Sequence, residues 1–444
     1  YLYYNLTGTQ VVTPMAIMTS DAKGNHRRIS QLMQDSDWFG RPTSSFKLFR
    51  QPLVPVLGIA DGRWLLSSPL RPMAKPGGHG AIWKLMHDEG VFDWLRQQGR
   101  EAAIIRQISN PMAGMDTTLL ALAGCGQQRA AAFGFMSCDR TLGASEGCNV
   151  LQERRVRKGD RWSYEYGYTN IEYTEFDRLG ISDQPVDGNS RRSVFPANTN
   201  VLYVKLDAAK KVVDSAVATA NSEQLMPGLI FNLKKTVAYK DPLTGQEHKV
   251  PAGRMECTMQ NIADHMTDRL DAPLSPQEIA RKDLSTFLVY NMRRKVTSSA
   301  KKRREPGSTR ISQTPDGSFY DLQRNAWHLL QQCGMQQLPE LGSVEQYLET
   351  GPGFICLFHP ALGPLWDVIS QKIVGGSLHD GSELVLEVAE ARLRNLNVKG
   401  SLLVYADNVM GHQQRLAPGA GVAAAGAHGA SAHVDMTASL SQFD

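Results

Sequence analysis

Three glycines and a histidine within six residues, Lys75-Pro-Gly-Gly-His-Gly80, form the segment that most restricts how this chain can fold. Glycine tolerates left-handed backbone angles and close approach by other groups, so such a cluster is unsuited to ordinary core packing. The residues that follow, 81–86, predict a helix. A glycine loop that leads into a helix presents free N–H groups and the positive end of the helix dipole, which suit a phosphate. The loop alone leaves two interpretations open, a tight turn or part of a nucleotide cradle.

The composition is that of an ordinary globular protein with room for two or three domains. The chain has 444 residues, of which 42% are hydrophobic and 21% are charged. A net charge of +4 is small for this length and does not by itself indicate nucleic acid. Apolar runs stay shorter than the ~20 residues that cross a bilayer, so no membrane partner is expected. The six cysteines form no C-x-x-C pair, which argues against a zinc or redox site and favours free, buried thiols.

The pattern of apolar residues predicts alternating strands and helices over residues 11–136. Strands are expected at 11–18, 102–108 and 133–136, and helices at 25–34, 81–87, 91–98 and 116–123, the last with Asp116 as N-cap. Segments 162–168 and 201–206 then read as further strands. We therefore expect an α/β core with a mixed, mainly parallel sheet flanked by helices.

The chain changes character toward its carboxyl end. From residue 382 onward, short apolar alternations interrupted by Gly400 predict a small β-rich module that resembles a β-helix or a barrel. Residues 419–432 are nearly all Gly, Ala and His and predict disorder. We expect three parts: a core over 1–350, the start of a β-rich module over 351–410, and a disordered Gly/Ala-rich tail over 411–444.

Six short motifs in a fixed order resemble the UDP-sugar pyrophosphorylases, and most of all the plastid UDP-glucose pyrophosphorylases of plants and algae. The resemblance covers roughly residues 1–410. Each motif is weak alone, and the shared order makes the signal specific. The motifs are Gln10-Val-Val-Thr-Pro-Met-Ala-Ile-Met-Thr-Ser20, Phe49-x-Gln51-Pro52-x-x-Pro55, Lys75-Pro-Gly-Gly-His-Gly80, Phe195-Pro-Ala-Asn-Thr-Asn200, Met255-Glu-Cys-Thr258 and Arg294-Lys-x-Thr-Ser298.

The resemblance implies a uridylyltransferase that makes UDP-glucose and pyrophosphate from UTP and glucose 1-phosphate, with Mg²⁺. It also implies the chloroplast stroma and a supply of UDP-glucose for sulfolipid synthesis. The residue types suit that chemistry, because the attacking phosphate oxygen is already anionic and needs no general base. Such a site needs glycine loops, amides, lysines and a metal, and we find no convincing nucleophile–base pair in the chain.

On the nucleotide side, the resemblance assigns Gln51, Gly78, His79 and Gly80. A glutamine amide offers both a donor and an acceptor, which the edge of uracil demands. The two glycines would let the backbone approach the base, with His79 near the phosphates or the sugar. A loop histidine bonded to backbone is the alternative for His79.

On the sugar side, the resemblance assigns Asn198, Asn200 and Glu256, because amides and carboxylates suit hydroxyl groups. Strand-entry capping and ordinary exposure are the alternatives. Lys295, in Arg294-Lys-x-Thr-Ser298, resembles the family lysine that reaches the phosphates and is the expected catalytic residue. We read the basic run at 301–304 as a mobile flank.

Two departures from the family pattern concern the phosphates and the metal. Relatives carry a glycine-rich nucleotide loop upstream of the point where this chain begins at Tyr1, so we expect a truncated piece that turns over nothing by itself. Ser109 stands where many relatives have a metal-binding Asp. Asn110 or Asp116 is the candidate replacement, although a neutral amide holds Mg²⁺ less well than a carboxylate.

Three other functions stay open on the sequence. An N-acetylglucosamine 1-phosphate enzyme would need only extra room beside the sugar. A non-catalytic UDP-sugar-binding protein would fit the missing acid at Ser109. Nucleic-acid binding through 301–304 is disfavoured, because no interleaved aromatic residues accompany the basic run.

Overall fold

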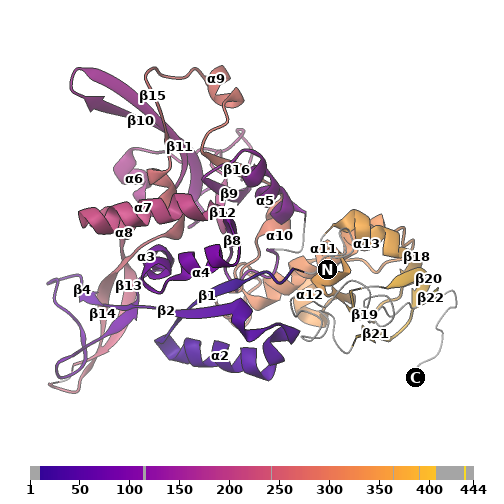
Figure 1. Cartoon of the computed structure of the whole chain (residues 1–444). Coiled ribbons are helices and arrows are strands. Elements are labelled where there is room, and N and C mark those ends of the chain that lie inside the picture. Colours follow the sequence, from indigo (N-terminus) through magenta and orange to yellow (C-terminus); the bar gives the residue numbers. More distant parts are fainter. Residues whose placement is uncertain are drawn as a thin grey trace.

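The computed structural model describes residues 11–113, 117–241, 243–363, 365–389, 391–406 and 435–436 (Figure 1). Asp116, the expected N-cap and candidate metal ligand, lies outside these residues. So does the tail expected over 411–444, apart from the two residues of β22 (Asp435–Met436).

A seven-stranded sheet forms the centre of the molecule. β9 (Phe133–Cys138) is buried along its whole length, as its apolar sequence requires. Its side chains alternate between two clusters, with Phe133 and Phe135 in one and Met136 and Cys138 in the other, so both faces of the sheet are covered. The remaining strands are β8 (Ala102–Ile105), β10 (Cys148–Lys158), β11 (Arg161–Ile171), β12 (Ala197–Lys205), β15 (Asp268–Leu270) and β16 (Thr286–Tyr290).

The expected mixed sheet is confirmed. The expectation that most of its strand pairs would be parallel is wrong, because antiparallel pairs predominate. The strand order is β15-β11-β10-β12-β9-β16, with β8 also paired to β12. Among the pairings seen in the described residues of this sheet, β9–β16 is parallel and the others are antiparallel. The reason is that β10 and β11 form a long hairpin, and that β12 inserts between β8 and β9 in the opposite direction.

Helices pack on both faces of this sheet (Figure 1). One cluster joins the sheet to α3 (Ile82–Asp88), α4 (Val91–Gln97), α7 (Leu206–Thr219) and the 3-10 helix η6 (Met259–His265). The other joins it to α5 (Thr118–Gln128) and to α10 (Arg293–Val296) through Val296. The helices expected at 81–87 and 91–98 are therefore confirmed, separated by Gly90 at a φ of 61°.

The first strands of the chain form a small sheet of their own. β1 (Met15–Ser20) pairs in parallel with β2 (Phe46–Gln51). Between them lie α2 (Asn25–Asp35), the helix expected at 25–34, and short 3-10 helices at Ala22–Gly24, Asp37–Gly40 and Thr43–Ser45.

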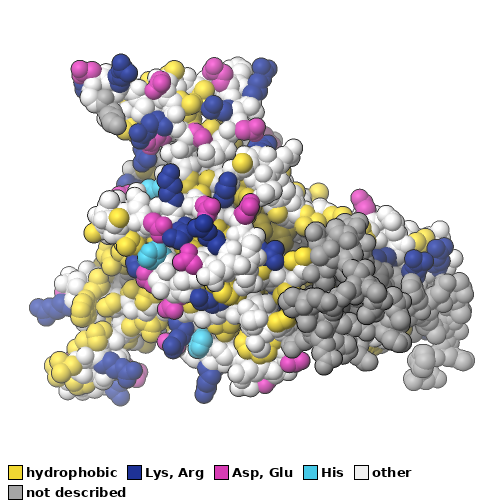
Figure 2. All heavy atoms as spheres, in the orientation of Figure 1, with side chains coloured by type: hydrophobic (Ala, Val, Ile, Leu, Met, Phe, Trp, Pro, Cys, Tyr) yellow, Lys and Arg dark blue, Asp and Glu magenta, His cyan; other side chains and the backbone are white. Residues whose placement is uncertain are grey.

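A β-rich lobe extends from the core at the lower left of Figure 1. Its three-stranded sheet has the order β13 (Ile230–Lys240), β14 (Glu247–Glu256), β4 (Leu57–Gly58). Beside it lie the pairs β3 (Leu53–Pro55) with β7 (Ala74–Pro76) and β5 (Leu66–Ser68) with β6 (Arg71–Pro72). Figure 2 shows hydrophobic side chains gathered on this lobe, where Ile59, Trp64 and Leu243 are exposed.

The carboxyl-terminal part is a β-helix-like module, as the sequence pattern indicates. Successive strands alternate between two parallel sheets, of order β17-β19-β21 and β18-β20-β22. Its hydrophobic core begins at Ala326 in α11, so this helix packs with the strands. Its elements are α11 (Pro315–Gln332), α12 (Val344–Thr350), β17 (Phe354–Phe358), η7 (Pro360–Leu362), α13 (Trp366–Lys372), β18 (Ile373–Leu378), β19 (Ser382–Glu387), β20 (Arg392–Val398) and β21 (Ser401–Tyr405). The domain boundary expected at residue 350 stays a prediction.

Short helices complete the fold: η4 (His79–Ala81), η5 (Tyr173–Glu175), α6 (Phe176–Leu179), α8 (Ser222–Leu225) and α9 (Pro276–Arg281). All six cysteines are free thiols and five are buried, as expected. Burial raises the pKa of the Cys138 thiol to about 12, so this thiol stays protonated at neutral pH. Within the described residues, no helix combines the length and the apolar character that crossing a membrane requires.

Candidate functional site

A polar cavity of about 910 Å³ lies where the central sheet, the β13–β14 lobe and α11 meet. Segments far apart in the sequence contribute to its walls, so the fold gathers it from the whole chain. Its lining includes His79, Ser145–Gly147, Glu172–Glu175, Asn198–Asn200, Ile230, Phe231, Leu233, Glu256, Thr258, Arg293, Thr297–Ser299, Lys301, Ile311–Gln313, Gly317, Tyr320, Asp321, Arg324 and Val344.

The glycine loop packs against a second stretch of backbone, at Cys257. The N–H of Gly80 donates to the Cys257 carbonyl at 2.9 Å, and the Cys257 N–H donates to the Gly77 carbonyl at 3.0 Å. A Cβ on Gly80 would lie 2.7 Å from the Cys257 carbonyl carbon, and Gly78 has a φ of 95° with the same neighbour. Both glycines are thus explained by a contact inside the protein. Of this loop, His79 is the residue that lines the cavity among those described.

His79 presents a fixed hydrogen-bond donor to the cavity. Its Nδ1 accepts the backbone N–H of Met259 at 3.0 Å, and a backbone N–H can only donate, so the ring proton must be on Nε2. The pKa of His79 is lowered to about 4, mainly by burial and also by the positive charge of Lys301, while Glu256 opposes the shift. The ring is therefore neutral at pH 7.

Asn198 and Asn200 form a linked pair of amides at the start of β12. Asn198 Nδ2 donates to Asn200 Oδ1 at 2.9 Å, and the Asn200 N–H donates back to Asn198 Oδ1 at 3.2 Å. Asn200 adopts a left-handed backbone with φ of 57°, at the bulge that interrupts pairing with β9. The Asn198 N–H also donates to the Gly147 carbonyl at 2.9 Å. The structure thus brings these two of the three predicted sugar residues to the cavity.

Two carboxylates face the same cavity. Glu172 Oε1 accepts the Asn170 amide at 3.1 Å, and burial raises the pKa of Glu172. Glu256, a predicted sugar residue, lines the cavity and forms an ion pair with Arg254. A Cβ added to Gly147 would lie 2.9 Å from Glu172 Oε1, so Gly147 is in close contact with Glu172. Because Gly147 also accepts the Asn198 N–H, Gly147, Glu172 and the amides of β12 lie in one corner of the cavity.

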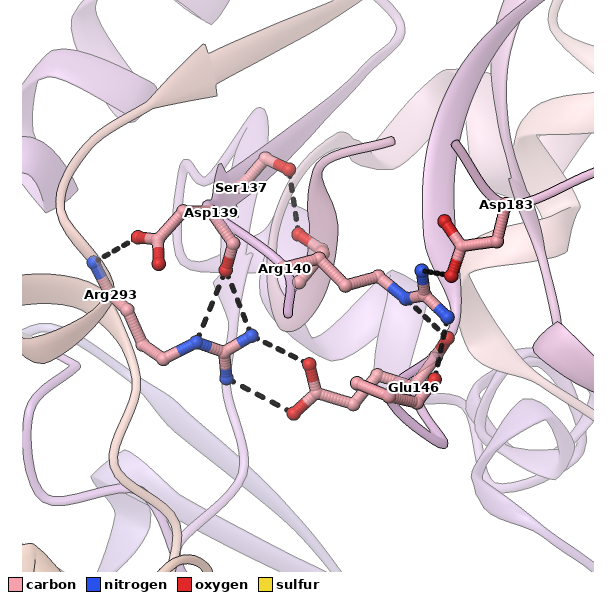
Figure 3. Close-up of polar contacts among 8 residues, drawn as sticks. Ser137, Asp139, Arg140, Glu146, Asp183 and Arg293 are labelled. Carbon is pink, nitrogen blue, oxygen red and sulfur yellow. Dashed lines mark hydrogen bonds and ion pairs between the residues drawn. The ribbon is translucent and has the colours of Figure 1, made fainter. Parts of the chain in front are cut away.

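An arginine clamp that the sequence reading missed holds the neighbouring wall of the cavity (Figure 3). Arg293 binds the Glu146 carboxylate through two hydrogen bonds of 3.0 and 2.6 Å. Its guanidinium also donates twice to the Asp139 carbonyl, at 3.1 and 2.9 Å. Arg140, only 1% exposed, holds the same loop through the carbonyls of Ala144 and Glu146 and pairs with Asp183 at 2.7 Å. Residues 143–147 are therefore a fixed wall.

Two more predicted residues lie outside the described lining of the cavity, as Gly78 and Gly80 do. Lys295 Nζ is 3.9 Å from the ring centroid of Trp366 in α13, and Lys295 does not belong to the described lining of the cavity. Gln51 ends β2, outside that lining as well, and its buried Oε1 lacks a hydrogen-bond partner among the described residues. The roles given to Lys295, Gln51, Gly78 and Gly80 stay predictions.

Lys301, which belongs to the basic run interpreted as a mobile flank, lines the cavity. Its N–H donates to the Gln313 carbonyl at 2.9 Å, and the preceding Ala300 N–H donates to the Ser109 carbonyl at 2.8 Å. Its exposed side chain lines the cavity. Arg293 is paired with Glu146 and Arg324 lies 3.6 Å from Asp321, but within the part of the chain that the structure describes no carboxylate pairs with the Lys301 ammonium.

Asn110, one of the two candidate metal ligands, is fully used in holding the backbone. It is 4% exposed; its Nδ2 donates to the Val296 carbonyl at 3.0 Å and its Oδ1 accepts the Ser298 N–H at 3.0 Å. The described residues contain no group of three or more His, Cys, Asp or Glu that could hold a metal ion. They therefore do not fit a protein cage for Mg²⁺.

The mixed sheet, its helices on both faces and the polar cavity define an α/β nucleotidyltransferase fold. The chain belongs to the UTP–glucose-1-phosphate uridylyltransferase family, whose sequence model matches residues 4–236. A second model, of UGP3-like C-terminal hexapeptide repeats, matches residues 373–434 and accounts for the β-helix-like module.

Relatives agree with this assignment. The chloroplastic UTP–glucose-1-phosphate uridylyltransferase 3 of Arabidopsis thaliana is 47% identical over 411 residues, which are 93% of this chain and 45% of the relative. The UDP-sugar pyrophosphorylase of Oryza sativa subsp. indica is 24% identical over 44% of this chain and 30% of its own length. This chain thus spans less than half the length of either relative.

One solved structure shows the same fold at low identity. The uridine diphosphate N-acetylglucosamine pyrophosphorylase of Trypanosoma brucei superposes with a TM-score of 0.54 at 17% identity, over 83% of this chain and 66% of that one.

Proposed function

We propose that this chain forms the catalytic part of a uridylyltransferase that makes UDP-glucose from UTP and glucose 1-phosphate. In the reaction, an oxygen of the sugar phosphate forms a bond to the α-phosphorus of UTP, and the bond from that phosphorus to the bridging oxygen breaks, in line, to release pyrophosphate. The attacking oxygen is already anionic, so the site must position two polyanions and offset their repulsion. Family membership and the relatives' activities support this proposal.

The observation that carries the proposal is that one cation, which no carboxylate of the described residues holds in an ion pair, shares a cavity with amides and carboxylates. Lys301 supplies a positive charge that no carboxylate of the described residues pairs with. Asn198, Asn200 and Glu172 supply hydroxyl-binding groups in the same cavity. A hexose phosphate needs both features at once. On this basis Lys301, rather than Lys295, contacts the phosphates, and His79 donates from Nε2.

Three parts of the proposal rest on the family rather than on the cavity. Mg²⁺ would enter bound to the UTP phosphates, because such ions are usually held by few protein carboxylates and several phosphate oxygens. Plastid location follows the name of the Arabidopsis relative. A role in supplying UDP-glucose for sulfolipid is consistent with that location.

The test is UTP-dependent release of pyrophosphate by the full-length protein, assayed with glucose, galactose and N-acetylglucosamine 1-phosphates. Release with glucose 1-phosphate is expected. Faster release with N-acetylglucosamine 1-phosphate would establish the alternative enzyme. Tight binding of UDP-glucose without release would establish a non-catalytic binding protein, and absence of both binding and release would reject the proposal.

A further inference from the structure

α10 (Arg293–Val296) lies between the central sheet and the β-helix-like module, next to α11 (Figure 1), and its Lys295 reaches Trp366 of α13. A helix of four residues cannot hold itself, since isolated helices need many more residues to be stable in water. Its position must therefore come from contacts with its neighbours. Its three successive basic side chains, Arg293, Arg294 and Lys295, each contact a different neighbouring segment.

The first contact is with the cavity wall. Arg293 binds Glu146 and the Asp139 carbonyl, and its own N–H donates to Asp139 Oδ1 at 3.2 Å (Figure 3). Four of its guanidinium hydrogen bonds are thus made within the protein, so Arg293 fixes the 143–147 wall rather than offering itself to an anion.

The other two contacts are with the carboxyl-terminal module. Asn325 of α11 binds α10 twice: its Nδ2 donates to the Arg294 carbonyl at 2.8 Å, and its Oδ1 accepts from the Arg294 guanidinium. Lys295 lies over the ring of Trp366 of α13, at 3.9 Å from its centroid, which is the geometry of a cation–π contact. Each contact uses a side chain whose partner belongs to the module.

We propose that the carboxyl-terminal module sets the geometry of the Glu146 wall through α10, with Asn325 and Trp366 as positioning residues. The module holds α10 on one side, and Arg293 carries that position to the loop that forms a wall of the proposed sugar-binding corner. Val296, buried in the core, and the Asn110 bond to its carbonyl fix the other end of α10, so a change at the module tilts the helix instead of releasing it. The effect on sugar binding rests on the proposed function; the effect on the wall does not.

Hydrogen–deuterium exchange of the full chain without ligand tests the structural step. Asn325→Ala is expected to speed exchange of the amides in 142–149 about tenfold, as loss of one or two hydrogen bonds implies. Gln332→Ala is the matched control, because this amide is on the same helix and bonds to Asp367 instead. Trp366→Leu should act like Asn325→Ala, and Trp366→Phe should restore slow exchange by keeping a ring under Lys295.

Arg293→Lys removes the two hydrogen bonds to the Glu146 carboxylate directly. It should therefore give the largest increase in the exchange rate of the amides in 142–149. Unchanged exchange in Arg293→Lys, or equal increases in Asn325→Ala and Gln332→Ala, would overturn the proposal. If the wild type makes UDP-glucose, Asn325→Ala should raise KM for glucose 1-phosphate severalfold and leave KM for UTP within about twofold. Equal rises in both KM values would contradict the sugar-side assignment. A wild type without activity would reject the proposed function and leave the exchange result to decide this inference.

Discussion

The Nδ1 atom of His79 accepts the backbone N–H of Met259 at 3.0 Å, across a sequence separation of 180 residues. This bond fixes the ring as a neutral Nε2–H donor facing the cavity. It also ties the glycine loop to the start of η6, so that the proposed nucleotide side and the central fold share one anchor.

The first prediction concerns pH. Because the pKa of His79 is lowered to about 4 in the folded chain, folding stability from this residue is present above its unfolded pKa of about 6.5 and is lost as pH falls toward 4. Between pH 7 and pH 4.5 the loss should be about 2 kcal/mol. Urea unfolding of wild type and His79→Asn at both pH values measures it, and an identical pH dependence in the two proteins would contradict it.

The second prediction concerns the glycine loop. Gly80→Ala should destabilise the chain by about 1–3 kcal/mol, because the new Cβ meets backbone atoms of Cys257 and Thr258 at 2.7 Å. Gly124→Ala in α5 is the control: a Cβ there has open space, so the helix should gain roughly 0.5–1 kcal/mol. Shifts of the urea midpoint in opposite directions are expected, and a neutral Gly80→Ala would refute the packing account.

The third prediction separates two neighbouring lysines. Lys301→Gln should lower kcat/KM about 10²–10³-fold, since it removes a charge that offsets the phosphates. The kcat/KM of Lys302→Gln should stay within about twofold of the wild-type value, because Lys302 is outside the described lining of the cavity. Similar losses in both variants would show that only the net charge of the run matters.

The fourth prediction concerns metal removal. Chelation by EDTA should abolish pyrophosphate release and leave the melting temperature within about 1 °C, because a metal that enters with UTP does not stabilise the free protein. The described residues contain no cluster of three ligands, consistent with this expectation. A marked fall in melting temperature would reveal a metal held by the protein itself.

Local patterns predicted the elements well. The apolar spacing around Gly90 predicted α3 and α4, and the short alternations after residue 382 predicted the β-helix-like module. Strand directions were harder, because pairing of β12 between β8 and β9 depends on contacts far apart in the sequence.

The cavity was predicted in part. Asn198, Asn200, His79 and Glu256 all line it, because each stands in a motif at the end of a regular element. Lys301 lines the cavity and Lys295 does not, and the sequence does not show that Lys295 lies over Trp366. Glu146 sits in Gly143-Ala-Ser-Glu-Gly147, which reads as a plain turn, and only the fold brings Arg293 to it.

The contact between the glycine loop and Cys257 also has a consequence for how the chain is made. The loop is synthesised about 180 residues before the backbone that completes it. At ribosomal rates of about 5–20 residues per second, it waits roughly 9–36 s for its partner. During that interval the histidine has no acceptor role and the glycines have nothing to pack against. The packing of the glycine loop is therefore completed only after synthesis has passed Cys257, well after the loop itself and α3 have been made.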